Sequence, residues 1–206
     1  FRPLDMLGMV YRTIRQGLID MAEMFRLMDT DVEVSDKPGA PALIIRQPSV
    51  AFDNVMFGYD KDRTILNGLS FEVPAGRNYA VVGPSGAGKS TLARLLFRFY
   101  DPQSGRIMID GQDIKEVTQA SVRAAIGIVP QDSVLFNDTI GYNIGYGRED
   151  ATQAEIEMAA RGAALRGLID RLPKRFDTEV GERGLKLSGG EKQRVAIART
   201  LVKNPP

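Results

Sequence analysis

The chain has 206 residues, of which 43% are hydrophobic and 26% are charged, and its formal net charge is +1. This length allows one domain with a core plus an additional segment, and the near-neutral charge gives no general attraction to nucleic acid. Because the sequence contains neither cysteine nor histidine, it excludes disulfides, thiolate or histidine metal sites and histidine acid–base catalysis within the chain.

Residues 4–28 have the periodicity of an amphipathic helix, with apolar side chains at steps of three and four. These apolar residues are Leu4, Leu7, Tyr11, Ile14, Leu18, Met21, Phe25 and Met28. The helix either packs on its own domain or connects it to a domain upstream. Residues 29–49 carry three prolines and a glycine among acidic and small residues, which predicts a linker.

A strand-rich region follows the predicted linker. Apolar residues alternate from Val50 to Tyr59, and residues 69–73 predict a second strand. Residues 78–82 read as a short buried strand that runs into glycines. Further strands are predicted at 106–110 and at 126–129, where Pro130 ends the apolar run.

Helical patterns dominate from about residue 139 to residue 172. Thr152 with Glu155 three positions later is a capping box, which marks the start of a helix. Along the chain the predicted order is therefore β-rich, then mixed, then helical.

The run Gly83–Ser90 matches the phosphate-binding pattern G-x-x-x-x-G-K-[ST] in full, between a predicted strand and an apolar helix. Its glycines allow a tight turn whose N–H groups point at phosphate oxygens, and the following helix N-terminus favours an anion. The candidate nucleotide-binding residues are Gly83, Pro84, Ser85, Gly86, Ala87, Gly88, Lys89, Ser90 and Thr91. Lys89 supplies a charge for the β- and γ-phosphates, and the Ser90 hydroxyl is a candidate Mg²⁺ ligand. The alternative is a glycine turn without a ligand.

A second helix start lies at Leu187–Glu191, which we call the signature segment. Ser188 at the N-cap and Glu191 at the third helical position form another capping box. Gly189 and Gly190 leave the backbone N–H groups sterically open, which is typical of an anion site. Taken alone, the segment also fits a capped helix that binds nothing.

Together, GPSGAGKST and LSGGEKQR make residues 49–206 resemble an ATP-binding-cassette (ABC) ATPase. The resemblance implies an α/β fold: a P-loop ABC ATPase core with an antiparallel β subdomain and an α-helical signature subdomain, preceded by an amphipathic connecting helix. It further implies ATP and Mg²⁺ as cofactors. In that family the segment at Ser188–Glu191 binds the nucleotide held on the phosphate loop of a second copy, so we expect a homodimer.

Two further positions acquire roles from the resemblance. Tyr59 falls where the family stacks an aromatic ring on adenine, and Gln131 falls where a loop glutamine contacts Mg²⁺ and the attacking water. Their alternatives are a tyrosine on a half-buried strand face and a solvated loop amide. Residues 178–184 resemble an exporter-type segment that touches transmembrane coupling loops, with an ordinary surface turn as the alternative.

The resemblance also sets the predicted domain organisation: 1–30 as a connecting helix from a transmembrane domain, 31–48 as a linker, and 49–206 as the nucleotide-binding domain. In the family, an Mg²⁺-binding Asp, a water-activating Glu and a γ-phosphate-contacting His follow the signature helix. The chain ends before them. We therefore expect it to be a piece of a longer protein that does not sustain ATP turnover by itself.

Residues 11–25, 97–102, 130–140 and 180–194 resemble the mitochondrial and bacterial half-transporters linked to iron–sulfur maturation and heavy-metal tolerance. This implies ATP-driven export, of glutathione-related or metal-conjugate compounds, from the cytoplasmic or matrix face of an inner membrane. It implies a transmembrane domain in the same chain as a partner, and no nucleic acid. The alternatives are a soluble ABC ATPase, for which the sequence lacks a coiled-coil insertion, an importer subunit, and a nucleotide-binding module without turnover.

Overall fold

The computed structural model describes residues 2–29, 32–60, 63–182 and 185–206. The chain divides into two compact units, Phe1–Ser35 and Asp36–Pro206. The first unit consists mainly of helix α1 (Arg2–Met28), which confirms the helix predicted from the apolar periodicity. Its large apolar side chains are exposed. Among the described residues, no helix combines the length and the hydropathy needed to cross a membrane.

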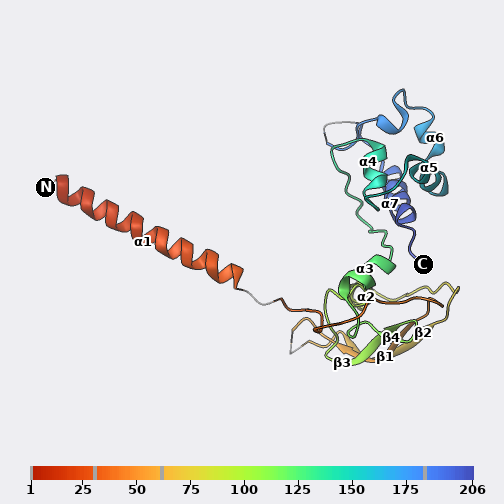
Figure 1. The fold of residues 1–206 in the computed structure, drawn as a ribbon, viewed down its shortest axis with the longest axis horizontal. Helices are drawn as coiled ribbons and strands as arrows, with labels where there is room; N and C mark the ends of the chain where they lie inside the picture. The colour runs from red at the N-terminus through yellow and green to blue at the C-terminus, as the bar shows by residue number, and fades with distance from the viewer. Residues whose placement is uncertain (1, 30–31, 61–62, 183–184) are drawn as a thin grey trace. The chain divides into compact units, whose positions relative to one another are not determined.

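The second unit begins with an antiparallel sheet (Figure 1). Its strands are β1 (Val50–Phe57), β2 (Leu66–Val73), β3 (Ser104–Ile109) and β4 (Gln112–Asp113). They lie in the order β2-β1-β3-β4, so β1 is paired on both sides. The strands predicted from the alternation that starts at Val50, from residues 69–73 and from residues 106–110 are therefore confirmed.

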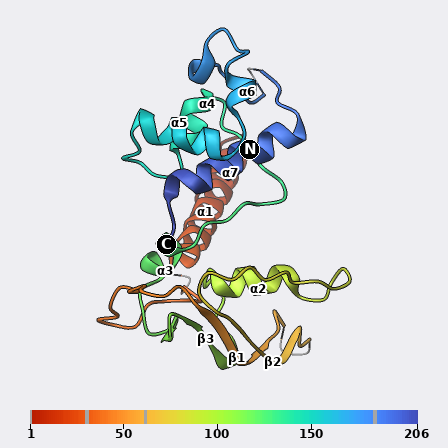
Figure 2. The same cartoon turned by 90° about the vertical axis from the view of Figure 1, so that its right-hand side faces the viewer.

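Helices α2 (Lys89–Leu96) and α3 (Gln119–Ala125) cover one face of this sheet (Figure 2). Leu95 of α2 and Val122 of α3 are fully buried against it. The core of this layer comprises Phe52, Val55, Phe57, Leu66, Leu95, Ile107, Ile109, Ile114, Val117 and Val122. The sheet and α2 together hold the glycine-rich run in place, because that run leads directly into α2.

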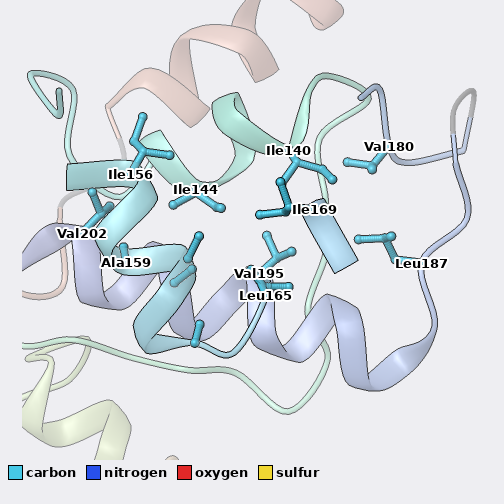
Figure 3. Packing of buried hydrophobic residues seen from close by; sticks show 13 residues of the cluster. Ile140, Ile144, Ile156, Ala159, Leu165, Ile169, Val180, Leu187, Val195 and Val202 are labelled. Atoms are coloured by element: carbon cyan, nitrogen blue, oxygen red, sulfur yellow. The ribbon is translucent and has the colours of Figure 1, made fainter. Parts of the chain in front are cut away.

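The remainder of the second unit is helical and has its own core (Figure 3). Its helices are α4 (Ile140–Gly145), α5 (Gln153–Gly162), α6 (Arg166–Ile169), the 3₁₀ helix η1 (Arg175–Asp177) and α7 (Gly189–Lys203). Ile140, Ile144, Leu165, Ile169 and Val195 meet at the centre of this core. The predicted capping boxes at the starts of α5 and α7 are both present.

Two sequence predictions are wrong. Residues 78–82 were expected to form a buried strand and residues 126–129 a further apolar strand, but neither forms a strand, and Tyr79, Val82 and Ile128 are exposed. Apolar composition raises strand propensity, but a strand also needs a hydrogen-bonding neighbour. Among the described strands none pairs with either segment.

Part of the predicted linker is fixed along the second unit. Asp36 pairs with the guanidinium of Arg98 at 3.1 Å, and the amide of Leu43 donates to Ser121 Oγ at 2.8 Å. Arg98 is almost fully buried, so its ion pair with Asp36 anchors the start of this segment. The segment at 36–48 thus lies with the sheet, while the functional division of the chain into three parts stays a prediction.

Candidate functional site

The backbone of the glycine loop, Gly83–Gly88, requires glycine at two positions. Gly86 has φ +83° and Gly88 has φ +87°, a region that L side chains rarely adopt. A Cβ added to Gly88 would also lie 3.1 Å from side-chain carbons of Ile65 and Leu66. Gly88 therefore allows the loop to approach the sheet closely just before α2 begins.

The N-terminus of α2 is open to an anion. Its N-cap is Gly88, no side chain caps it, and its first turn contains no acidic residue. Lys89 Nζ donates to the carbonyl oxygens of Gly83 and Pro84, at 2.7 Å each, so the ammonium lies over the loop. Exposed backbone amides, a helix N-terminus and a lysine ammonium together fit a phosphate group.

The first two hydroxyls of α2 differ in burial. Ser90 is exposed beside the loop, whereas Thr91 is buried. An exposed serine hydroxyl next to a phosphate site fits Mg²⁺, which prefers oxygen ligands and keeps several waters. The described part of the chain holds no cluster of three acidic, histidine or cysteine residues that could bind a metal ion.

Tyr59 lies just after β1 and contacts α2. Its hydroxyl lies 3.4 Å from Thr91 Oγ1 and accepts a hydrogen bond from Arg94 at 3.0 Å. Burial alone raises the pKa of Tyr59, but the hydrogen bonds from Thr91 and Arg94 outweigh it and the net pKa is lowered. The ring also packs edge-on against Phe57 and Tyr100 and is 41% exposed, which leaves part of its surface for a planar partner.

Helix α7 begins at the signature segment, where both hydrogen bonds of a capping box are formed. Ser188 Oγ accepts from the amide of Glu191 at 3.4 Å, and the Ser188 amide donates to Glu191 Oε2 at 2.8 Å. The Ser188 hydroxyl also donates to Glu191 Oε2, and the two hydrogen bonds from the Ser188 amide and hydroxyl to this carboxylate lower the pKa of Glu191. Ser188, Gly189 and Gly190 are exposed. The box uses the amides of Ser188 and Glu191, so it leaves those of Gly189 and Gly190 to solvent or a ligand.

Gln131 lies on an exposed loop, residues 129–135, which we call the glutamine loop. The chain that leaves this loop pairs with the segment at residues 178–184, which resembles an exporter-type segment. Ile140 N donates to Thr178 O at 3.0 Å, and Val180 N donates to Asp138 O at 2.9 Å. Residues 183 and 184 of that segment lie outside the described residues.

The structure brings some predicted site residues together and leaves others apart. Tyr59 contacts Thr91, the last residue of the predicted phosphate-binding run, on α2. Within the described residues, no hydrogen bond joins Gln131 or the signature segment to the glycine loop. Arg94 was not among the residues predicted from the sequence; it lies one helical turn after Thr91, and its guanidinium stacks over the Tyr59 ring at 5.7 Å. Because Thr91 and Arg94 are three positions apart on a predicted helix, their spacing indicates that both side chains lie on the same face of it.

Comparison with known proteins identifies matches over the whole chain. The family model described as "ABC transporter" matches residues 66–206. An "ATM1-type heavy metal exporter" of Novosphingobium aromaticivorans is 78% identical over 206 residues, which is 100% of this chain and 34% of that protein. An "Iron-sulfur clusters transporter atm1, mitochondrial" of Aspergillus fumigatus is 54% identical over 204 residues, covering 98% of this chain and 28% of that protein.

A solved structure agrees with the sequence comparisons. The "Structure of a bacterial Atm1-family ABC exporter with ATP bound" superposes with a TM-score of 0.89 at 78% identity. It covers 100% of this chain and 36% of the solved chain. The chain thus spans about a third of the length of the relatives it matches, and its α/β ABC ATPase fold is confirmed.

Proposed function

The chain belongs to the ABC transporter family, and on this premise we propose that it is the ATP-binding and ATP-hydrolysing cassette of a membrane exporter. The observation that carries the proposal is the open N-terminus of α2, where Lys89 lies over the glycine loop and no side chain occupies the cap. This arrangement favours the binding of a polyphosphate, the part common to all nucleoside triphosphates.

Each site residue has a proposed role in this chemistry. Lys89 neutralises the β- and γ-phosphates, Tyr59 stacks on the adenine, and Gln131 orients the attacking water and contacts the metal ion. Ser90 is the proposed protein ligand for Mg²⁺, which when bound supplies the positive charge that offsets charge developing in phosphoryl transfer. The exposed face of Tyr59 and the exposed hydroxyl of Ser90 support these roles.

We propose a homodimer in which Ser188–Glu191 of one copy completes the site held by Lys89 of the other. Two features of α7 support this role: the free Gly189 and Gly190 amides and the exposure of both glycines. A single glycine loop and a single signature segment per chain then give two equivalent sites by two-fold symmetry.

Residues 1–30 are the proposed connecting helix from a transmembrane domain of the same protein, with 31–48 as the linker and 49–206 as the cassette. The exposed apolar side chains of α1 support a partner for this helix. The cassette would then face the cytoplasm or, in a mitochondrion, the matrix. The proposed cargo is a glutathione-related or metal-conjugate compound; the names of the matched relatives, which refer to heavy metals and iron–sulfur clusters, support the metal part of this proposal.

The test uses the full-length protein in inside-out membrane vesicles, supplied with a glutathione conjugate of mercury(II). We expect uptake that requires ATP and is lost in Lys89→Ala. Uptake of equal size without ATP, or in Lys89→Ala, would contradict ATP-driven export. ATP hydrolysis without uptake of the conjugate would contradict only the proposed cargo, and not the proposed ATPase activity.

A further inference from the structure

The chain that leads into the glutamine loop is held by two side chains of α7. Thr200 Oγ1 lies 2.8 Å from the carbonyl oxygen of Ile128, where it donates in competition with the Ala196 carbonyl at 3.0 Å. Lys203 Nζ donates to the carbonyl oxygen of Ile126 at 2.7 Å and to that of Arg123 at 2.6 Å. Burial lowers the pKa of Lys203, as expected for an ammonium partly removed from water.

A third side chain of α7 reaches the other end of the loop through Asn143 of α4. Arg199 Nε donates to the carbonyl oxygen of Asn143 at 2.9 Å, and a terminal nitrogen donates to Asn143 Oδ1 at 3.2 Å. The Arg199 guanidinium also lies over the rings of Phe136 and Tyr146, at 5.6 and 5.7 Å. Arg199 therefore contacts the residue that follows the glutamine loop both directly and through Asn143.

Asn143 is fully buried and both ends of its amide hold the chain after the loop. Its Oδ1 accepts from the Phe136 amide at 2.9 Å, and its Nδ2 donates to the Phe136 carbonyl at 3.1 Å and the Thr139 carbonyl at 2.9 Å. A buried amide with its donors and acceptor satisfied fixes backbone position, because any displacement would leave polar groups unpaired.

We propose that Arg199, Thr200 and Lys203 are positioning residues that hold both ends of the glutamine loop on α7, the helix that begins at the signature segment. A nucleotide engaged at Gly189 and Gly190 would then set the position of Gln131, since both are attached to one rigid helix. This inference rests on the proposed function for the role of Gln131, whereas the attachment itself is a property of the fold.

The test compares Thr200→Val and Arg199→Lys in the full-length protein. Valine keeps the shape of threonine but removes the donor, and lysine keeps the charge of arginine but loses its two-point contact. Arg161→Lys on α5 is the matched control, because Arg161 is exposed and makes no side-chain hydrogen bond or ion pair within the described ranges. Lys89→Ala is the blank for turnover.

Two measurements are made on each variant: hydrogen exchange of peptides covering residues 129–139, which include the Phe136 amide, and kcat and KM for ATP. We expect exchange to quicken and kcat to fall, each about three- to tenfold. KM should stay unchanged, as should exchange in α2 and every value in Arg161→Lys.

Unchanged exchange of residues 129–139 in both variants would overturn the attachment. Faster exchange with unchanged kcat would overturn the positioning role. If turnover of the parent protein were equal to that of Lys89→Ala, the proposed function would fail, while the exchange data would still decide whether α7 holds the loop.

Discussion

Two glycine-flanked helix N-termini in this chain are built in opposite ways. α2 starts at Gly88 without any side-chain cap, whereas α7 starts at Ser188 with both halves of a capping box formed. The first turn of α2 contains no acidic residue, whereas that of α7 contains Glu191. An uncapped end leaves its amides to a ligand at some cost in stability, while a capped end is stable without one.

The difference matches the roles proposed for the two ends. The α2 end carries its own cation, Lys89, and in the proposed role it would surround the phosphates bound to its own chain. In the proposed dimer, the α7 end would supply two amides to a nucleotide already bound by a second copy, so it would be preformed and would need no cation of its own. Substitutions at the two ends should therefore affect different properties.

The largest expected effect follows from removing the cation at the α2 end. Lys89→Ala should weaken Mg-ATP binding by about 1.5–3 kcal/mol, because a charge-assisted contact to phosphate is lost. Its free energy of unfolding should change by less than about 0.5 kcal/mol, since the side chain is exposed. Calorimetry on the full-length protein measures the affinity, with the exposed Lys174→Ala as the control. Equal affinity in Lys89→Ala and the parent would refute the phosphate assignment.

Replacing one glycine by alanine at each helix N-terminus tests whether the two helix starts require glycine in the same way. Gly88→Ala should destabilise the protein by about 1–3 kcal/mol, because its φ of +87° is strained for alanine and the Cβ meets Ile65 and Leu66. A Cβ on Gly189 would meet nothing within 4 Å, and its φ is not positive. Gly189→Ala should therefore raise helix stability by about 0.5–1 kcal/mol. Thermal unfolding compares the pair, and equal losses in both would contradict the difference.

Removing the cap of α7 should have a moderate effect on stability. Ser188→Ala removes the acceptor for the Glu191 amide and a donor to Glu191 Oε2, at a cost of about 0.5–2 kcal/mol. Urea unfolding measures this loss, and Ser188→Thr should restore most of it. If Ser188→Ala were as stable as the parent, the capping box would not stabilise the start of α7.

The smallest effect concerns the capped start of α5, which has the same box without a proposed ligand. Arg148, followed by the amide and hydroxyl of Thr152, lowers the pKa of Glu155 from 4.5 to about 2. Stability from this lowered pKa is present above pH 4.5 and is lost as the pH falls toward 2. Acid titration by circular dichroism should show a weaker pH dependence in Glu155→Gln than in Glu157→Gln. Equal curves would contradict this linkage.

Local patterns in the sequence predicted the elements that local interactions stabilise. The periodicity of residues 4–28 and the boxes at Thr152 and Ser188 all correspond to helices, because caps and apolar stripes act within a few residues. Residues 78–82 were predicted wrongly, because whether an apolar segment forms a strand depends on a partner strand distant in sequence.

The candidate site was predictable where one motif contains the chemistry. Gly83–Thr91 carries its glycines, its lysine and its hydroxyl in one run. By contrast, the contacts of Asn143 with Arg199 join residues far apart in the chain, and neither position belongs to a local motif. Such contacts arise only when α4 packs on α7, so sequence alone gave no signal for them.

Mixed dimers test most directly the claim that the α2 N-terminus of one copy and the α7 N-terminus of the other copy act on the same nucleotide. Lys89→Ala is placed in one copy and Gly189→Tyr in the other, and ATP hydrolysis of the purified mixed dimer is measured. The reverse arrangement has both substitutions in one copy beside an unsubstituted partner. With sites shared between copies, the first dimer keeps one intact site and hydrolyses ATP, while the second keeps none. Activity in the second dimer and none in the first would contradict the account, because Lys89 and Gly189 would then serve a site within one chain.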